Sequence, residues 1–180
     1  MAVHAAVTSL QRAVRELQDR LRLLLRLIDD HPETGETVVV DLVRDACDDL
    51  QGWLAGLAEA TQRACAAAER RDPVRLGGQL AACATACEVS VQRFVTGLAG
   101  VESIARLRRL AHDRPGEWQE WSWQVQDGIG ETWPQVWALR SHLDSCWQEL
   151  VERLQDEPVL VRAQVEQAGA PSEDAAAGGR

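Results

Sequence analysis

The stretch that decides the fold is residues 3–28, VHAAVTSLQRAVRELQDRLRLLLRLI. Apolar side chains recur along it in alternating steps of four and three residues. This four-heptad seam is typical of a long helix that packs along one face, as in coiled coils and helical bundles. Its members are Val3, Val7, Leu10, Val14, Leu17, Leu21, Leu24 and Ile28.

The end of this first helix is apolar well beyond its seam. Leu23, Leu25 and Leu27 lie between or beside the seam positions. We therefore expect this end to be covered by more than one neighbouring helix or by a partner, with Leu23 and Leu27 as candidate contact residues. Pro32 and Gly35 predict that the helix stops there.

Two further stripes follow the same spacing. The second predicts a helix from about residue 39, because the length of TVVVDLV at 37–43 fits a strand or a helix but the register that follows favours a helix. Asp72 and Pro73 form a start signal for the third, which should bend near Gly100. The predicted core positions are Val39, Val43, Ala46, Leu50, Trp53, Leu57, Ala60 and Ala64, then Leu80, Ala84, Cys87, Val91, Phe94, Leu98, Val101 and Ala105.

The fourth segment contains most of the tryptophans. Residues 117–137 read EWQEWSWQVQDGIGETWPQVW, and an apolar face continues to about residue 155. Gly128, Gly130 and Pro134 interrupt the helical pattern. We expect two nearly collinear helices broken near 128–132, in preference to one helix kinked near 128–134.

On a helical wheel the tryptophans divide into two groups. Four fall on or beside the core face, where large rings would fill the space left by the Ala-rich second and third helices. These are Trp118, Trp121, Trp133 and Trp147. Trp137 lies on the flank and Trp123 points away from the core, so these two are candidate partner-binding residues.

The four stripes predict an all-α fold, an up-down antiparallel four-helix bundle of long helices in a single domain. We place the bundle at residues 1–156, a possible short helix at 157–168, and a disordered tail, rich in small and polar residues, at 169–180.

Composition restricts the classes of partner. The 180-residue chain has a net charge of −9, which disfavours nucleic acid and anionic membranes. It contains no Lys, Asn or Tyr, whose codons are A/T-rich, which suggests a GC-rich, actinobacterial-type genome. No signal-peptide pattern or membrane-length apolar run is present, so we expect a cytoplasmic protein with five free thiols.

Familiar catalytic and nucleotide-binding motifs are missing from the sequence, and we expect neither an enzyme nor a bound cofactor. The Arg106, Arg108, Arg109 and Arg114 patch is small for a nucleic-acid footprint and fits a solvated face or an acidic partner better. The main hypothesis is a non-enzymatic interaction or adaptor protein, an accessory subunit of a bacterial regulatory or conflict system. It would bind a protein partner or self-associate through the Trp-rich fourth helix and the Leu-rich end of the first.

The alternative is a soft-metal (Zn or Cu) or thiol-redox protein. Cys83 and Cys87 share one face of the third helix, and His142 and Cys146 share one face of the fourth. If the two helices are antiparallel, these four side chains meet at one level, and sulfur and imidazole ligands suit Zn²⁺ or Cu(I). Plain packing of buried cysteines as small apolar groups is the simpler interpretation.

Overall fold

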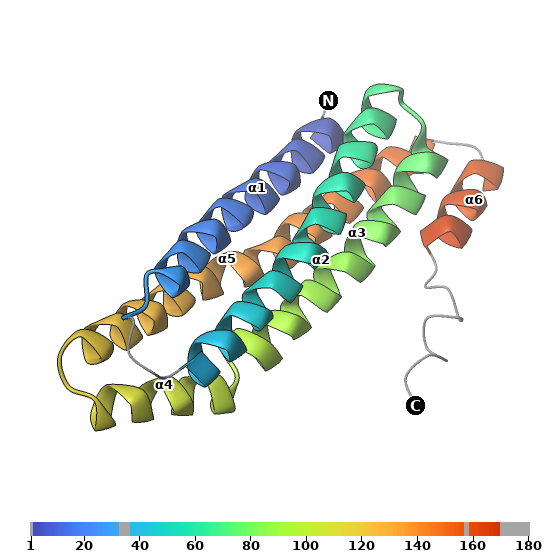
Figure 1. Cartoon of the computed structure of the whole chain (residues 1–180). Helices are drawn as coiled ribbons and strands as arrows, with labels where there is room; N and C mark the ends of the chain where they lie inside the picture. The colour runs from blue at the N-terminus through green and yellow to red at the C-terminus, as the bar shows by residue number, and fades with distance from the viewer. Residues whose placement is uncertain (1, 33–36, 157–158, 170–180) are drawn as a thin grey trace.

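The computed structural model describes residues 2–32, 37–156 and 159–169, and no strand occurs within these ranges. The helices form one all-helical assembly (Figure 1). They are α1 (Ala2–Asp29), α2 (Thr37–Glu69), α3 (Pro73–Arg93), the π-helix η1 (Phe94–Leu98), α4 (Val101–Asp113), α5 (Glu117–Arg153), the 3₁₀ turn η2 (Leu154–Asp156) and α6 (Val159–Gly169). Of the tail predicted at 169–180, Gly169 belongs to α6, and residues 170–180 lie outside the described residues.

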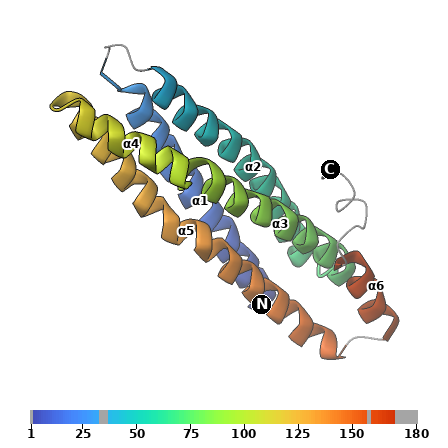
Figure 2. The same ribbon diagram turned by 90° about the horizontal axis from the view of Figure 1, so that it is seen from below.

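Each long helix packs against at least two others. α1 contacts α2 and α5, α3 contacts α2 and α5, and α4 continues along α5 from the end of η1 (Figure 2). Ser9 lies beside His142 at one end of the α1–α5 pair, whereas Leu27 lies beside Trp121 at the other, so these two helices are antiparallel.

The seam of α1 is confirmed at all eight predicted positions, each of which is buried. The apolar residues next to it behave differently from one another. Leu25 and Leu27 pack at the edge of the core, whereas Leu23 is 61% exposed.

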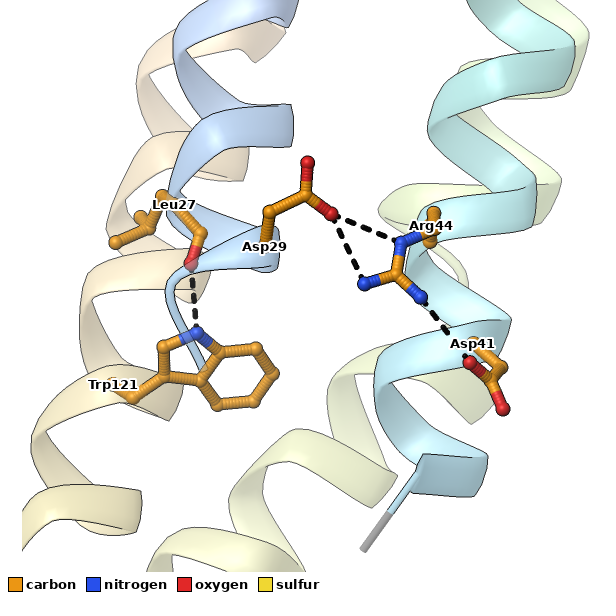
Figure 3. Close-up of polar contacts among 5 residues, drawn as sticks. All are labelled: Leu27, Asp29, Asp41, Arg44 and Trp121. Atoms are coloured by element: carbon orange, nitrogen blue, oxygen red, sulfur yellow. Dashed lines mark hydrogen bonds and ion pairs between the residues drawn. The ribbon is translucent and has the colours of Figure 1, made fainter. Parts of the chain in front are cut away.

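Side-chain contacts connect the end of α1 to two neighbours (Figure 3). The buried Trp121 indole donates a hydrogen bond from Nε1 to the Leu27 carbonyl oxygen at 2.8 Å, which satisfies an acceptor in the last turn of α1. On the other side, the Arg44 guanidinium bridges Asp29 at 3.0 Å and Asp41 at 3.3 Å.

The core face of α2 differs from the prediction at two positions. Cys47 and Leu54 are fully buried, whereas Ala46 lies at the edge and Trp53 is 38% exposed. The reason is that α2 packs between α1 and α3, so its buried face is wider than a single seam. Ala46 still serves a close contact, because a Cβ on Gly97 would lie 3.0 Å from the Ala46 Cβ.

The third stripe follows the core face of the helix as far as Leu98 and departs from it beyond that residue. Val101 is 88% exposed and Ala105 is also exposed, while Leu107 and Leu110 are buried. The π-helical turn η1 and the break before α4 change the helical phase, so the stripe cannot be extended across them. The predicted bend near Gly100 coincides with this break, and the Asp72 side chain caps α3 by accepting a hydrogen bond from the Arg75 amide.

The break predicted in the fourth segment is not present. α5 is one helix of 37 residues with Pro134 inside it. Pro134 is exposed, so the Gly130 carbonyl that loses its helical donor can be hydrated instead. Gly128 has a separate packing role, since a Cβ there would lie 3.0 Å from the Leu24 Cδ1 of α1.

Near its N-terminus, α3 carries α6 on its outer side. A Cβ on Gly77 would lie only 2.9 Å from the Val165 Cγ1, and one on Gly78 would lie 3.9 Å from the Ala168 Cβ. Gly77 therefore allows α6 to approach closely, whereas the distance at Gly78 is an ordinary contact, and Val165 is buried there.

A continuous α5 predicts the effect of replacing its proline. Pro134→Ala should raise the free energy of unfolding by about 1–2 kcal/mol, because Ala restores an amide donor and favours the helix interior. Urea unfolding followed by circular dichroism measures the change. The control is Pro73→Ala, at the first position of α3, where Pro is favourable and its loss should not stabilise. A decrease in stability for Pro134→Ala would contradict a continuous α5.

Candidate protein interaction surface

The tryptophans near the start of α5 belong to the core. Trp118 and Trp121 are buried and pack edge to face, with ring centroids 5.6 Å apart. His31 lies against both rings, at 6.1 and 6.5 Å. These contacts place the rings of Trp118 and Trp121 in the core beside the end of α1, as expected for large core residues.

Three other tryptophans of the same helix are open to solvent. Trp123 is 57% exposed, Trp137 is 41% exposed and Trp133 is 38% exposed. Trp133 packs on Phe94 of η1 with its centroid 5.6 Å away, and Trp137 packs edge to face on Trp133 at 5.8 Å. Trp133 is thus at the border of the core, and Trp123 and Trp137 are exposed as their phase predicted.

Because α5 is continuous, these rings share one side of it, which we call the tryptophan face. Its members recur every three or four residues from residue 119 to residue 137, and a helix with 3.6 residues per turn places such positions on one side. The face carries no charged side chain, although 26% of the chain is charged. It consists of Gln119, Trp123, Gln126, Gly130, Trp133, Pro134 and Trp137.

Leu23 and Leu27 form part of a different surface. They border a small groove of about 120 Å³ between α1 and α5, beside Gly128. Gly128 and Trp137 are nine residues apart, two and a half helical turns, so they point to opposite sides of α5. The four predicted partner-binding residues therefore lie on two separate surfaces.

The structure brings the three cysteines of the alternative hypothesis near one another, because Cys83 lies close enough to interact electrostatically with Cys87 and Cys146. Cys83, Cys87 and Cys146 are buried, but the Nδ1 atom of His142 lies 3.4 Å from the Ser9 Oγ on α1. His142 thus borders α1, whereas Cys83 and Cys87 belong to α3. Within the described ranges, no group of three or more His, Cys, Asp or Glu side chains has a metal-binding arrangement.

Burial suppresses ionisation of the thiols. It raises the pKa of Cys47, Cys83 and Cys146 to about 12 and that of Cys87 to about 11. Cys65 is half-buried, and burial raises its pKa too; its Sγ lies 3.8 Å from the Gln11 Oε1. Since the thiolate is the reactive form, these groups behave as small apolar side chains at neutral pH.

Of the other pockets on the surface, two adjoin residues considered above or the contact of α6 with α3. The start of α2 and the end of α4 enclose about 370 Å³ lined by Val38, Leu110 and Arg109, which includes part of the predicted arginine patch. The C-terminal part of α5 and α6 enclose about 490 Å³ lined by Trp147 and Val165, among others. Sequence reasoning missed the second pocket, although the adjacent Gly77 and Gly78 signal a close helix contact.

Comparison with protein-family models, curated proteins and solved structures finds no significant match. Among the described helices, none combines the length and apolar character that crossing a bilayer requires.

The burial of the thiols predicts a simple pattern of chemical reactivity. At pH 8 a disulfide reagent such as DTNB should modify Cys65 first, and the four buried thiols should react only as the protein unfolds. The Cys65 rate should keep rising above pH 9, because its pKa is raised.

Two controls accompany this measurement. Cys65→Ser should abolish the rapid phase, and all five thiols should react in concentrated guanidinium. A rapid phase that survives in Cys65→Ser would contradict the described burial.

Proposed function

We propose that this chain is a non-enzymatic interaction or adaptor protein whose tryptophan face binds a protein partner. In this proposal it is an accessory subunit of a bacterial, actinobacterial-type regulatory or conflict system and acts in the cytoplasm. The single observation that carries the proposal is the group of three exposed tryptophans on one uncharged side of a continuous helix.

The scaffold suits such a role. We interpret α1, α2, α3 with α4, and α5 as an up-down antiparallel four-helix bundle. The antiparallel contacts of α1 with α5 and the ion pair between Arg93 and Asp49 across α2 and α3 support this interpretation. A helix packed on two neighbours presents its outer side chains in a fixed arrangement, which lowers the entropy lost on binding.

The exposed rings offer a substantial part of a binding energy. At roughly 250 Å² for a whole Trp side chain, the three rings expose roughly 300 Å². Burial at about 25 cal/mol per Å² would contribute roughly 8 kcal/mol before the cost of association. Trp is also the residue type most enriched at binding hot spots, and depletion of charge is typical of interface cores.

The thiols give no support to a catalytic role. Every group with a clearly displaced pKa in the described ranges is a cysteine, and each displacement disfavours the nucleophilic thiolate. The geometry around His142 likewise gives no support to the soft-metal alternative.

Products of the genes adjacent to the gene for this chain are the natural candidate partners. Each would be co-expressed with the tagged chain, and affinity would be measured by calorimetry for any that co-purifies. Combining Trp123→Gln with Trp137→Gln should weaken binding by at least about 30-fold, because two hot-spot rings are lost.

The matched control is Trp53→Gln, which removes a ring of similar exposure from α2. It should leave the affinity unchanged. If the double variant binds the same partners as tightly as the wild type, the tryptophan face is not the binding surface.

A further inference from the structure

The arrangement of side chains around Gly130 has an approximate symmetry. Trp123 precedes Gly130 by seven residues and Trp137 follows it by seven. Seven residues are close to two helical turns, so all three lie on one stripe, with each ring about 10 Å along the axis from the glycine. Gly130 is exposed, and a Cβ added there would meet no atom within 4 Å.

This order of small and large residues fits a crossing of two helices. Crossing helices approach most closely at one point and diverge on both sides of it. A glycine at the crossing point allows close approach, and large rings a short distance away fill the widening gap. In a two-fold pair, residue i of one copy meets residue j of the other and vice versa. Trp123 and Trp137 can therefore exchange places about Gly130.

We infer that two copies of this chain pair through the tryptophan face, with their α5 helices antiparallel and the two-fold axis near Gly130. This inference rests on the proposed function and specifies its partner as a second copy. A second copy uses this spacing directly, because a two-fold axis at Gly130 places Trp123 of each copy beside Trp137 of the other.

Charge and area are consistent with a second copy. Each chain has a net charge of −9, so contact between copies is least unfavourable on a face without charge. The three rings supply roughly 300 Å² of the about 800 Å² that each partner contributes to a standard interface. The glutamines, Pro134 and the flanking residues of α5 provide the remainder.

Glu120, Asp127 and Glu131 lie along one flank of the face. In the antiparallel pair the same acidic flank of each copy lies on the same side. Repulsion between these flanks is screened by salt, so the pair should tighten as ionic strength rises.

Sedimentation equilibrium of the purified full-length chain, from about 1 to about 300 µM, tests the pairing directly. The wild type should approach twice the 19.8 kDa chain mass, and dissociation should decrease with added salt. Gly130→Leu should raise the dissociation constant by at least about 30-fold, because its side chain occupies the crossing point. A monomeric wild type across the whole range would overturn the inference.

The matched control is Gly56→Leu, at an exposed glycine of α2 that also has no atom within 4 Å of an added Cβ. It should pair as the wild type does. Both leucine variants should retain the helical circular dichroism signal, since Leu favours a helix more than Gly does. Trp123→Gln provides a second disruption should Gly130→Leu fail to fold. A stable dimer with unchanged affinity in either disrupting variant would place the interface elsewhere.

Disulfide cross-linking tests the antiparallel orientation. In a Cys65→Ser background, Gly130→Cys lies near the two-fold axis and should form a covalent dimer under mild oxidation. Gln126→Cys, four residues from the axis, should lie about 12 Å from its twin along the helix and should not cross-link. Efficient cross-linking of Gln126→Cys would indicate a parallel pair and overturn the inference.

The two proposals can fail separately. A wild type that is monomeric but binds a neighbouring gene product through Trp123 and Trp137 excludes the dimer and retains the adaptor function. A dimer disrupted by Gly130→Leu, combined with no effect of the double tryptophan variant on any partner, supports pairing and excludes these rings as the site for that partner.

Discussion

The continuity of helical phase through residues 128–134 of α5 is the constraint on which the rest of the structure depends. With one phase from Glu117 to Arg153, Trp118 and Trp121 face the core while Trp123 and Trp137 face solvent. A break would rotate the second half of the segment relative to the first and disperse the exposed rings. Continuity also aligns Gly130 midway between Trp123 and Trp137, so both the binding surface and its approximate symmetry are consequences of it.

Small residues determine where the helices approach one another. Gly97 lies against Ala46, Gly128 against Leu24 and Gly77 against Val165, and a Cβ added at any of the three would lie within about 3.0 Å of that neighbour. A glycine in a helix interior costs about 1 kcal/mol in helix propensity. The close helix contacts give the structural reason for having glycine at these positions despite that cost. Among the described residues Gly130 meets no such contact, so a reason for this glycine is to be found on the exposed surface of α5.

Sequence periodicity predicted the α1 seam residue by residue, because a seven-residue repeat without glycine or proline leaves the phase unambiguous. It predicted the exposure of Trp123 and Trp137 by the same reasoning. It failed at Val101 and Ala105, because the bend predicted near Gly100 did not reveal how far the π-helical turn shifts the helical phase. It also predicted a break at Gly128, Gly130 and Pro134, because propensity cannot tell that Gly128 serves a contact with α1 and that Pro134 faces water.

The most direct test of the account is the backbone conformation of residues 124–140 in solution. Cα and carbonyl chemical shifts from isotope-labelled protein report this conformation one residue at a time. A continuous α5 predicts helical shifts throughout the stretch, with a local perturbation confined to Gly130 and the residues next to Pro134. Three or more consecutive non-helical residues between 128 and 132 would contradict it, because Trp123 and Trp137 would then no longer share a face.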